Sequence, residues 1–137
     1  MTTINATKGE FVNLINGLFQ VQELKGKNFG LVVSKNITIL RKKLQHLEEL
    51  GKPSEEFMKL AVQVNEIAAN DPDGSKEIID QLEEDNKELV EKRREQMENV
   101  TERMKEKMSV KLKTLSTDIL PEDITAQQIS NLEQIIK

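Results

Sequence analysis

The sequence predicts a mainly α-helical protein, a helical hairpin or bundle with a minor two-stranded antiparallel ribbon formed by the N- and C-terminal segments. Apolar residues recur at the three- and four-residue spacing of amphipathic helices over most of residues 8–108, and the period becomes two only near the C-terminal end. Charged residues make up 32% of the chain and aromatic residues 3%, which favours helices with long exposed faces. We expect one domain spanning all 137 residues.

The N-terminal part predicts a short strand followed by a helix. Residues 2–6 are partly β-prone, and Thr7 to Glu10 has the capping-box form, in which the threonine and glutamate side chains each accept from the other's backbone amide. We expect a helix over about residues 8–25, because Gly26 then ends the pattern. Its apolar face consists of Phe11, Leu14, Ile15, Leu18 and Val21.

Two further helices are expected over about residues 28–50 and 53–69, separated by a break at Gly51–Pro53. The first has apolar residues at heptad spacing: Val33, Ile37, Leu40, Leu44 and Leu47. This seam is only about two heptads long, so we expect a pairing helix within the same domain rather than a free coiled coil. The second has one amphipathic face, formed by Phe57, Leu60, Ala61, Val64, Ile67 and Ala68.

A fourth helix is expected from residue 75 to about residue 108. It follows a turn at residues 70–74, a run of Asn, Asp, Pro and Gly. Its apolar stripe is thin, because Asn86 and Arg93 occupy positions where a packed seam would have leucine. We therefore expect this helix to be half exposed along much of its length.

The C-terminal part predicts a strand and one last helix. Apolar and polar residues alternate over about residues 109–116, the period of a strand. A lone strand leaves its backbone groups unpaired, so we expect it to pair with residues 2–6. A second capping box at Thr125 to Gln128 opens a helix over about residues 125–136, which we expect to pack over the ribbon.

The apolar faces of the expected helices should meet in one core. Gly17 and Gly30 lie inside helices, where glycine costs about 1 kcal/mol relative to alanine, so we expect close helix crossings at both. The residues expected in the core are Phe11, Leu14, Leu18, Val33, Ile37, Leu40, Leu44, Phe57, Leu60, Val64, Ile67, Leu82 and Leu89.

The sequence lacks the residue combinations of catalytic and metal sites. It has no cysteine and His46 is its only histidine, so a zinc ligand set is incomplete. The segment from Asp71 begins like a calcium loop, but its sixth and twelfth positions hold Lys76 and Leu82 instead of glycine and glutamate. The glycines are scattered and form no phosphate loop. We expect no enzymatic activity, no cofactor and no metal.

Charge and hydropathy narrow the choice of partner. The formal net charge is −4 with both signs interleaved, and the best basic cluster is only Arg41 to Lys43. Nucleic-acid binding requires a larger basic surface, so we expect none. No apolar stretch approaches the ~18–20 residues that span a bilayer, and the N-terminus has no signal-peptide pattern, so we expect no membrane association.

The half-exposed fourth helix is the expected protein-binding surface, with apolar anchors flanked by arginines. An alternative is that its methionines fill an internal hairpin, since methionine is a common gap-filler. The residues expected to contact a partner are Val90, Arg93, Arg94, Met97, Val100, Arg103, Met104 and Met108.

The order of features resembles a type of phage protein. The likeness rests on Leu24–Gly26, on the seam from Ser34 to Leu47, and on the closing segment from Leu120 to Ile136. The shared order of elements covers most of the chain and resembles that of small, uncharacterised helical proteins encoded by tailed bacteriophages. The resemblance implies a phage gene product that acts in the host cell cytoplasm or is built into the virion, and it implies no active-site residues.

Two functional hypotheses follow. The first is a non-enzymatic protein–protein interaction protein, namely a structural or assembly factor of a bacteriophage. The second is a phage-encoded inhibitor or regulator of a host enzyme, such as a defence or transcription component. The assembly factor predicts self-association as a homo-oligomer or association with particles, whereas the inhibitor predicts a monomer or dimer that binds one host protein.

Overall fold

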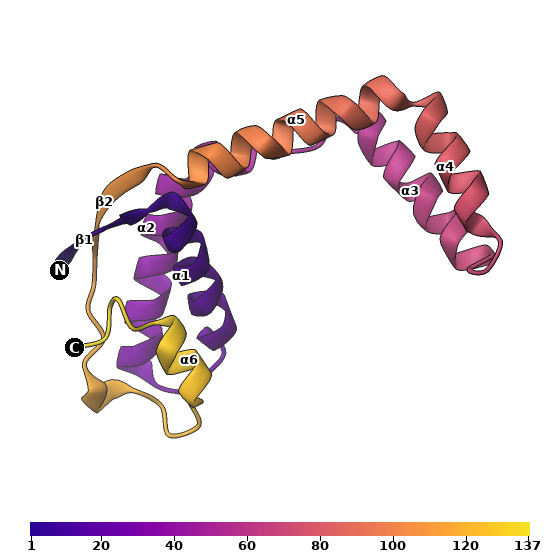
Figure 1. Cartoon of the computed structure of the whole chain (residues 1–137). Coiled ribbons are helices and arrows are strands. Elements are labelled where there is room, and N and C mark those ends of the chain that lie inside the picture. Colours follow the sequence, from indigo (N-terminus) through magenta and orange to yellow (C-terminus); the bar gives the residue numbers. More distant parts are fainter. The chain divides into compact units, whose positions relative to one another are not determined.

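The computed structural model describes residues 1–137 and confirms the fold class, mainly helices with a two-stranded antiparallel sheet (Figure 1). In chain order the elements are β1 (Thr2–Thr7), α1 (Lys8–Val21), α2 (Lys27–Leu50), α3 (Glu55–Asn70), α4 (Ser75–Asp85), α5 (Lys87–Met104), β2 (Lys107–Leu112), the 3₁₀ helix η1 (Thr117–Ile119) and α6 (Ala126–Asn131).

The chain divides into two compact units, where the sequence had predicted a single domain. Unit 1 consists of residues 1–48 and 102–137, and unit 2 consists of residues 49–101. Unit 2 has 15 Asp and Glu against 7 Lys and Arg, a formal net charge of −8. Unit 1 has 13 Lys and Arg against 9 Asp and Glu, a formal net charge of +4. The modest charge of the whole chain therefore conceals an acidic unit and a basic unit.

The two ends of the chain pair in unit 1, as the sequence predicted. Strands β1 and β2 are antiparallel, in a register that runs from Thr2 opposite Leu112 to Thr7 opposite Lys107. The second strand lies at 107–112 rather than 109–116. It ends at Leu112, because the backbone amide and carbonyl of the next residue, Lys113, bond to the Asn36 side chain instead of to β1. The side chains of Asn5 and Ser109 also bond to each other across the ribbon.

The capping box at Thr7 forms as predicted and turns β1 directly into α1. The Thr7 hydroxyl oxygen accepts from the Glu10 amide at 3.1 Å, and the Thr7 amide donates to the Glu10 carboxylate at 3.4 Å. The helix ends at Val21 rather than near residue 25, and the chain turns at Gly26, whose φ of 135° favours glycine. Its apolar face packs with α2 residues in one core.

The last helix is shorter than the predicted 125–136 and packs against α1 rather than over the ribbon (Figure 1). A Cβ on Gly17 would lie 3.0 Å from the Asn131 Cβ, so the prediction of a close crossing at Gly17 is confirmed. The prediction for Gly30 is wrong, because no atom lies within 4 Å of a Cβ built there. After α6, Leu115 forms a parallel bridge with Ile136, which ties the C-terminus into unit 1.

The core of unit 1 contains most of the predicted residues and several that the prediction missed. Phe11, Leu18 and Leu40 are fully buried, as predicted. The core prediction missed Ala6, Ile15, Val21, Phe29 and Leu47 in the N-terminal half, and it named no residue of β2 or of the segments after it, which contribute five more. These five are Val110, Leu112, Leu115, Leu132 and Ile135.

Unit 2 is a helical hairpin of α3 and α4 followed by α5, and it is thinly packed. Its only buried apolar side chains are Leu60 and Val100. The core prediction is correct for Leu60 and wrong for five residues, which are only half-buried because few helices surround them: Phe57, Val64, Ile67, Leu82 and Leu89.

The predicted helix over 75–108 is interrupted at Asn86, which separates α4 from α5. The Asn86 backbone has φ −116° and ψ 30°, and its side-chain amide donates to the Leu82 carbonyl at 2.8 Å. Asparagine side chains compete in this way with helical backbone bonds, so the interruption has a local cause in the sequence.

The buried Asn36 connects α2 to the residue that follows β2. Its side-chain amide donates to the Lys113 carbonyl at 2.9 Å, and the Lys113 amide donates to its side-chain oxygen at 2.8 Å. Asn36 is fully buried and both of its polar atoms are satisfied. This pair of bonds fixes the end of the ribbon against the second helix.

We expect Asn36→Ala to lower the free energy of unfolding by about 2–4 kcal/mol, because the Lys113 amide and carbonyl would lose their partners in a buried site. Urea unfolding followed by circular dichroism measures the change. Thr38→Ala is the control, since it removes an exposed bond to the Ser34 carbonyl on the same helix and should change stability by less than about 0.5 kcal/mol. Equal stability of the two variants would contradict the role assigned to Asn36.

Candidate interaction surface

Arg93, which was predicted to contact a partner, makes its polar contacts within unit 2. Its guanidinium donates to the Gly51 carbonyl at 2.8 Å and to the Gln96 side chain at 2.9 Å, and lies 5.6 Å from the centroid of the Phe57 ring. The Gln96 amide donates to the carbonyls of Leu50 and Lys52 at 2.8 and 2.7 Å. Arg93 and Gln96 thus hold the loop that precedes α3 against α5, so the polar contacts of the predicted contact residue Arg93 lie within unit 2.

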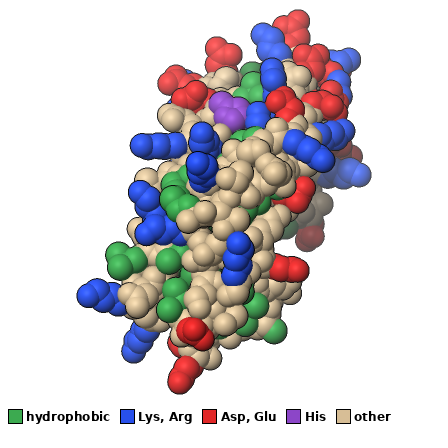
Figure 2. Space-filling model, turned by 90° about the vertical axis from the view of Figure 1, so that its left-hand side faces the viewer, with side chains coloured by type: hydrophobic (Ala, Val, Ile, Leu, Met, Phe, Trp, Pro, Cys, Tyr) green, Lys and Arg blue, Asp and Glu red, His purple; other side chains and the backbone are tan.

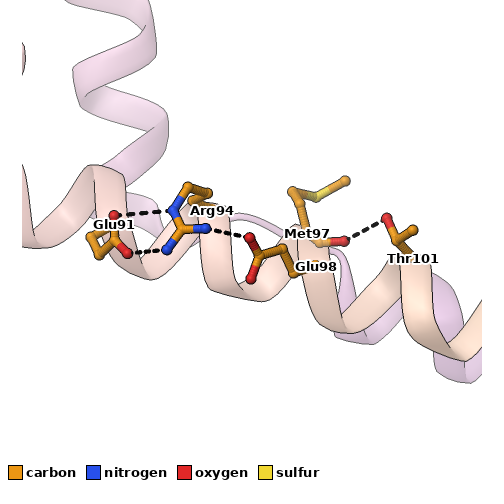
Figure 3. Close-up of polar contacts among 5 residues, drawn as sticks. All are labelled: Glu91, Arg94, Met97, Glu98 and Thr101. Atoms are coloured by element: carbon orange, nitrogen blue, oxygen red, sulfur yellow. Dashed lines mark hydrogen bonds and ion pairs between the residues drawn. The ribbon is translucent and has the colours of Figure 1, made fainter.

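Arg94 lies in an exposed charge ladder along α5 (Figure 3). Its guanidinium pairs with Glu91 one turn before it and with Glu98 one turn after it. The hydrogen bond from Arg94 lowers the pKa of the Glu91 carboxyl, and the hydrogen bond to Glu91 raises the pKa of Arg94. Because all three side chains are more than half exposed, the ladder contributes little to stability, and Arg94 remains accessible.

Arg103 pairs with Glu106 at 3.0 Å in unit 1. The same carboxylate accepts from the Lys8 ammonium at 3.1 Å. The hydrogen bonds from Lys8 and then from Arg103 lower the pKa of Glu106. The Lys8 amide also donates to the Glu106 carbonyl at 2.8 Å. These contacts extend the ribbon beyond the Thr7–Lys107 pair by one residue of each strand.

Most of the apolar residues that were predicted to contact a partner pack against other parts of the chain. Val100 is buried, and Met104 and Met108 pack against the core of unit 1. Val90 is half-buried and lines a small acidic hollow of α4 and α5. Met97 alone among these apolar residues is exposed, at 42%. The predicted surface is therefore corrected, because its apolar residues do not form one exposed stripe.

The structure exposes large apolar side chains of unit 2 that the sequence analysis did not single out. Met58 and Val62 lie one turn apart on α3, and Ile78 lies on α4, with exposed fractions of 51%, 55% and 53%. A signal was present in the sequence, since Met58 and Val62 fall outside the amphipathic face of their own helix. Of these three, Met58 and Val62 form an exposed apolar pair on one helix face, which a docked protein could cover.

An open groove of about 790 Å³ lies within unit 2, between α3 and the junction of α4 and α5. Charged and amide side chains dominate its lining, which consists of Glu56, Lys59, Leu60, Gln63, Glu84, Asp85, Asn86, Lys87, Glu88, Leu89 and Lys92. Both carboxylates and ammonium groups line the groove. Nowhere in the chain do three or more His, Asp or Glu side chains gather as a potential metal site.

Basic side chains characterise the surface of unit 1. Lys107 and Lys111 lie on one exposed face of the ribbon, opposite Thr7 and Thr3 of the other strand. Lysine and arginine side chains project at several places from the face drawn in Figure 2.

No helix of the chain combines the length and apolar character needed to cross a bilayer.

Comparison of the chain with family models, curated proteins and solved structures finds no match. The function is therefore inferred from the residues and their arrangement in the structure.

We expect Met104→Glu to lower the free energy of unfolding by about 2–4 kcal/mol, because it would place a carboxylate against an apolar core. Met97→Glu is the matched control on the same helix and should change stability by less than about 0.5 kcal/mol, since Met97 is exposed. Thermal and urea unfolding compare the two variants. Equal destabilisation would show that both methionines are internal.

Proposed function

We propose that this chain is a non-enzymatic protein–protein interaction protein that acts in the assembly of a tailed-bacteriophage particle, in the host cell cytoplasm or on the virion. The observation that supports it is the exposure of Met58, Val62, Ile78 and Met97 on the helices of unit 2. Such side chains serve as anchors when a partner covers them. The resemblance to small helical phage proteins supports the assembly context.

The contrast between the two units supports a docking role for unit 2. Unit 1 buries Phe11, Leu18 and Leu40 completely, so its stability has an evident source. Unit 2 keeps most of its apolar side chains half-buried or exposed. A partner that covers those side chains would bury apolar area, and this burial is favourable by about 25 cal/mol of free energy per Å². A protein partner is therefore the ligand class that best fits this unit.

Charge gives such docking its selectivity. Unit 2, which carries the exposed apolar residues, has a formal net charge of −8. A partner surface with apolar residues among lysines or arginines would be attracted, whereas another acidic surface would be repelled. We accordingly propose docking by helix faces, in which apolar anchors supply affinity and charges select the partner.

We expect the full chain to co-sediment with particles or particle precursors when lysates of particle-producing cells are separated on a density gradient. Ile78→Glu combined with Met97→Glu should reduce the co-sedimenting fraction at least tenfold, because a carboxylate would replace each apolar anchor. The control is Gln63→Glu combined with Asn99→Glu, which adds the same charge at exposed polar positions of unit 2. It should co-sediment like the unmodified chain.

Recovery of the chain only in the soluble fractions would overturn the assembly role. If it were found there in a stoichiometric complex with one host enzyme, the inhibitor hypothesis would replace it.

A further inference from the structure

Two exposed stripes, one in each unit, have matching chemistry. The acidic stripe is Glu55, Met58, Val62 and Glu66 of α3, in which two apolar side chains lie between two carboxylates. The basic stripe is Lys27, Leu31 and Lys35 of α2, in which one apolar side chain lies between two ammonium groups. Leu31 is 60% exposed.

Both stripes lie on helix faces that the other elements of their own unit leave uncovered. On α2 the buried residues include Val33, Ile37 and Leu40, and at 3.6 residues per turn the basic stripe falls on the opposite side. On α3 the buried residue Leu60 likewise points away from the acidic stripe. Each stripe is therefore available to another molecule.

The charged residues of the stripes have no ion-pair partner within the chain. None of Lys27, Lys35, Glu55 and Glu66 takes part in any of its salt bridges. This contrasts with α5, where Arg94 satisfies two carboxylates of its own helix. Unpaired charges beside exposed apolar side chains are free to select an oppositely charged surface.

The spacing of the two stripes is compatible. At a rise of 1.5 Å per residue, Lys27 and Lys35 lie about 12 Å apart along α2, with Leu31 midway. Glu55 and Glu66 lie about 16 Å apart along α3, with Met58 and Val62 between them. With the helices side by side, Leu31 can insert between Met58 and Val62. The two lysines are then about 1.5 and 3 Å along the axis from the nearest glutamates, well within the reach of their flexible side chains.

We propose that the occupant of the acidic stripe is the basic stripe of a second copy of this chain, so that copies associate head to tail. The deciding observation is charge complementarity. Two acidic stripes facing each other would repel, and so would two copies of unit 2, each with a formal net charge of −8. The basic stripe, by contrast, has the opposite charge and lies on unit 1, whose formal net charge is +4. The contact is heterologous, because each copy offers one stripe and leaves the other free for the next copy.

This inference rests on the proposed function and names a second copy of the chain as the protein partner. The head-to-tail contact and the assembly role can be overturned separately. Self-association is measured on the purified chain alone, whereas the assembly role is measured by co-sedimentation with particles. A chain that is monomeric when pure yet co-sediments with particles would overturn the head-to-tail contact and keep the assembly role.

Reciprocal charge reversal tests the contact directly. One full-length variant carries Lys27→Glu and Lys35→Glu, and the other carries Glu55→Lys and Glu66→Lys. Light scattering over a concentration series at low salt should show oligomers of the unmodified chain, and at least tenfold weaker self-association of each variant alone. An equimolar mixture of the variants should regain association, because every stripe again meets one of opposite charge. Raising the salt to 1 M should weaken association in all samples.

The control variants change the net charge equally at other places. Lys107→Glu with Lys111→Glu alters the ribbon of unit 1, and Glu77→Lys with Glu84→Lys alters α4. Glu77 lies in the first turn of its helix, as Glu55 does, so the second control also matches any effect on a helix terminus. Both controls should associate like the unmodified chain.

A second pair of variants removes apolar contacts without reversing charge. Leu31→Ser and Val62→Ser change exposed side chains, so the fold should persist while association weakens at least tenfold. An unmodified chain that is monomeric at every concentration at low salt overturns the proposal. So does a mixture of charge-reversed variants that, with circular dichroism like that of the unmodified chain, stays monomeric.

Discussion

The antiparallel pairing of β1 with β2 is the constraint on which unit 1 depends. It joins segments separated by about a hundred residues of chain and gives each strand the backbone partner that an isolated strand lacks. Because Thr7 both ends β1 and caps α1, the position of the ribbon fixes where the first helix begins. The Lys8–Glu106 contacts and the Asn36–Lys113 bonds then hold the two ends of β2.

In unit 2 no strands pair, and side-chain hydrogen bonds to backbone groups hold its turn and its loop. The hairpin of α3 and α4 turns through residues 70–74, where the Gly74 amide donates to the Asp71 carboxylate at 3.0 Å. Arg93 and Gln96 hold the loop before α3 through backbone carbonyls, which fixes the backbone while burying little apolar area. The unit is thus defined in shape but leaves apolar side chains exposed, which suits a surface that another protein covers.

Local signals account for the parts of the fold that the sequence predicted. Both capping boxes, at Thr7 and Thr125, involve residues three apart, so their geometry is readable without knowing the fold. The ribbon was predictable because only two segments of the chain had strand character. Asn86 was noticed as an interruption of the apolar stripe, although its consequence is a break between two helices.

What could not be predicted depends on distant neighbours. The bonds of Asn36 to Lys113 cross 77 residues, and a polar residue inside a helix gives no sign of such a partner. Met97 and Met104 belong to the same apolar stripe of the sequence, yet Met97 is exposed and Met104 packs on the core of unit 1. Periodicity identifies the apolar face of a helix but not the length over which that face is covered.

The division of charge between the units decides between two kinds of assembly. An isologous contact between two copies of unit 2 would cover their exposed apolar residues but would bring two units of −8 together. A heterologous contact covers the same residues and pairs opposite charges, and its affinity should fall as salt rises. A heterologous contact also leaves one stripe open at each end of the growing chain of copies. Growth then stops only when the rotation between copies closes a ring, and otherwise continues as a filament. The proposed head-to-tail contact would therefore be extendable, which fits the proposed assembly role better than the role of a monomeric inhibitor.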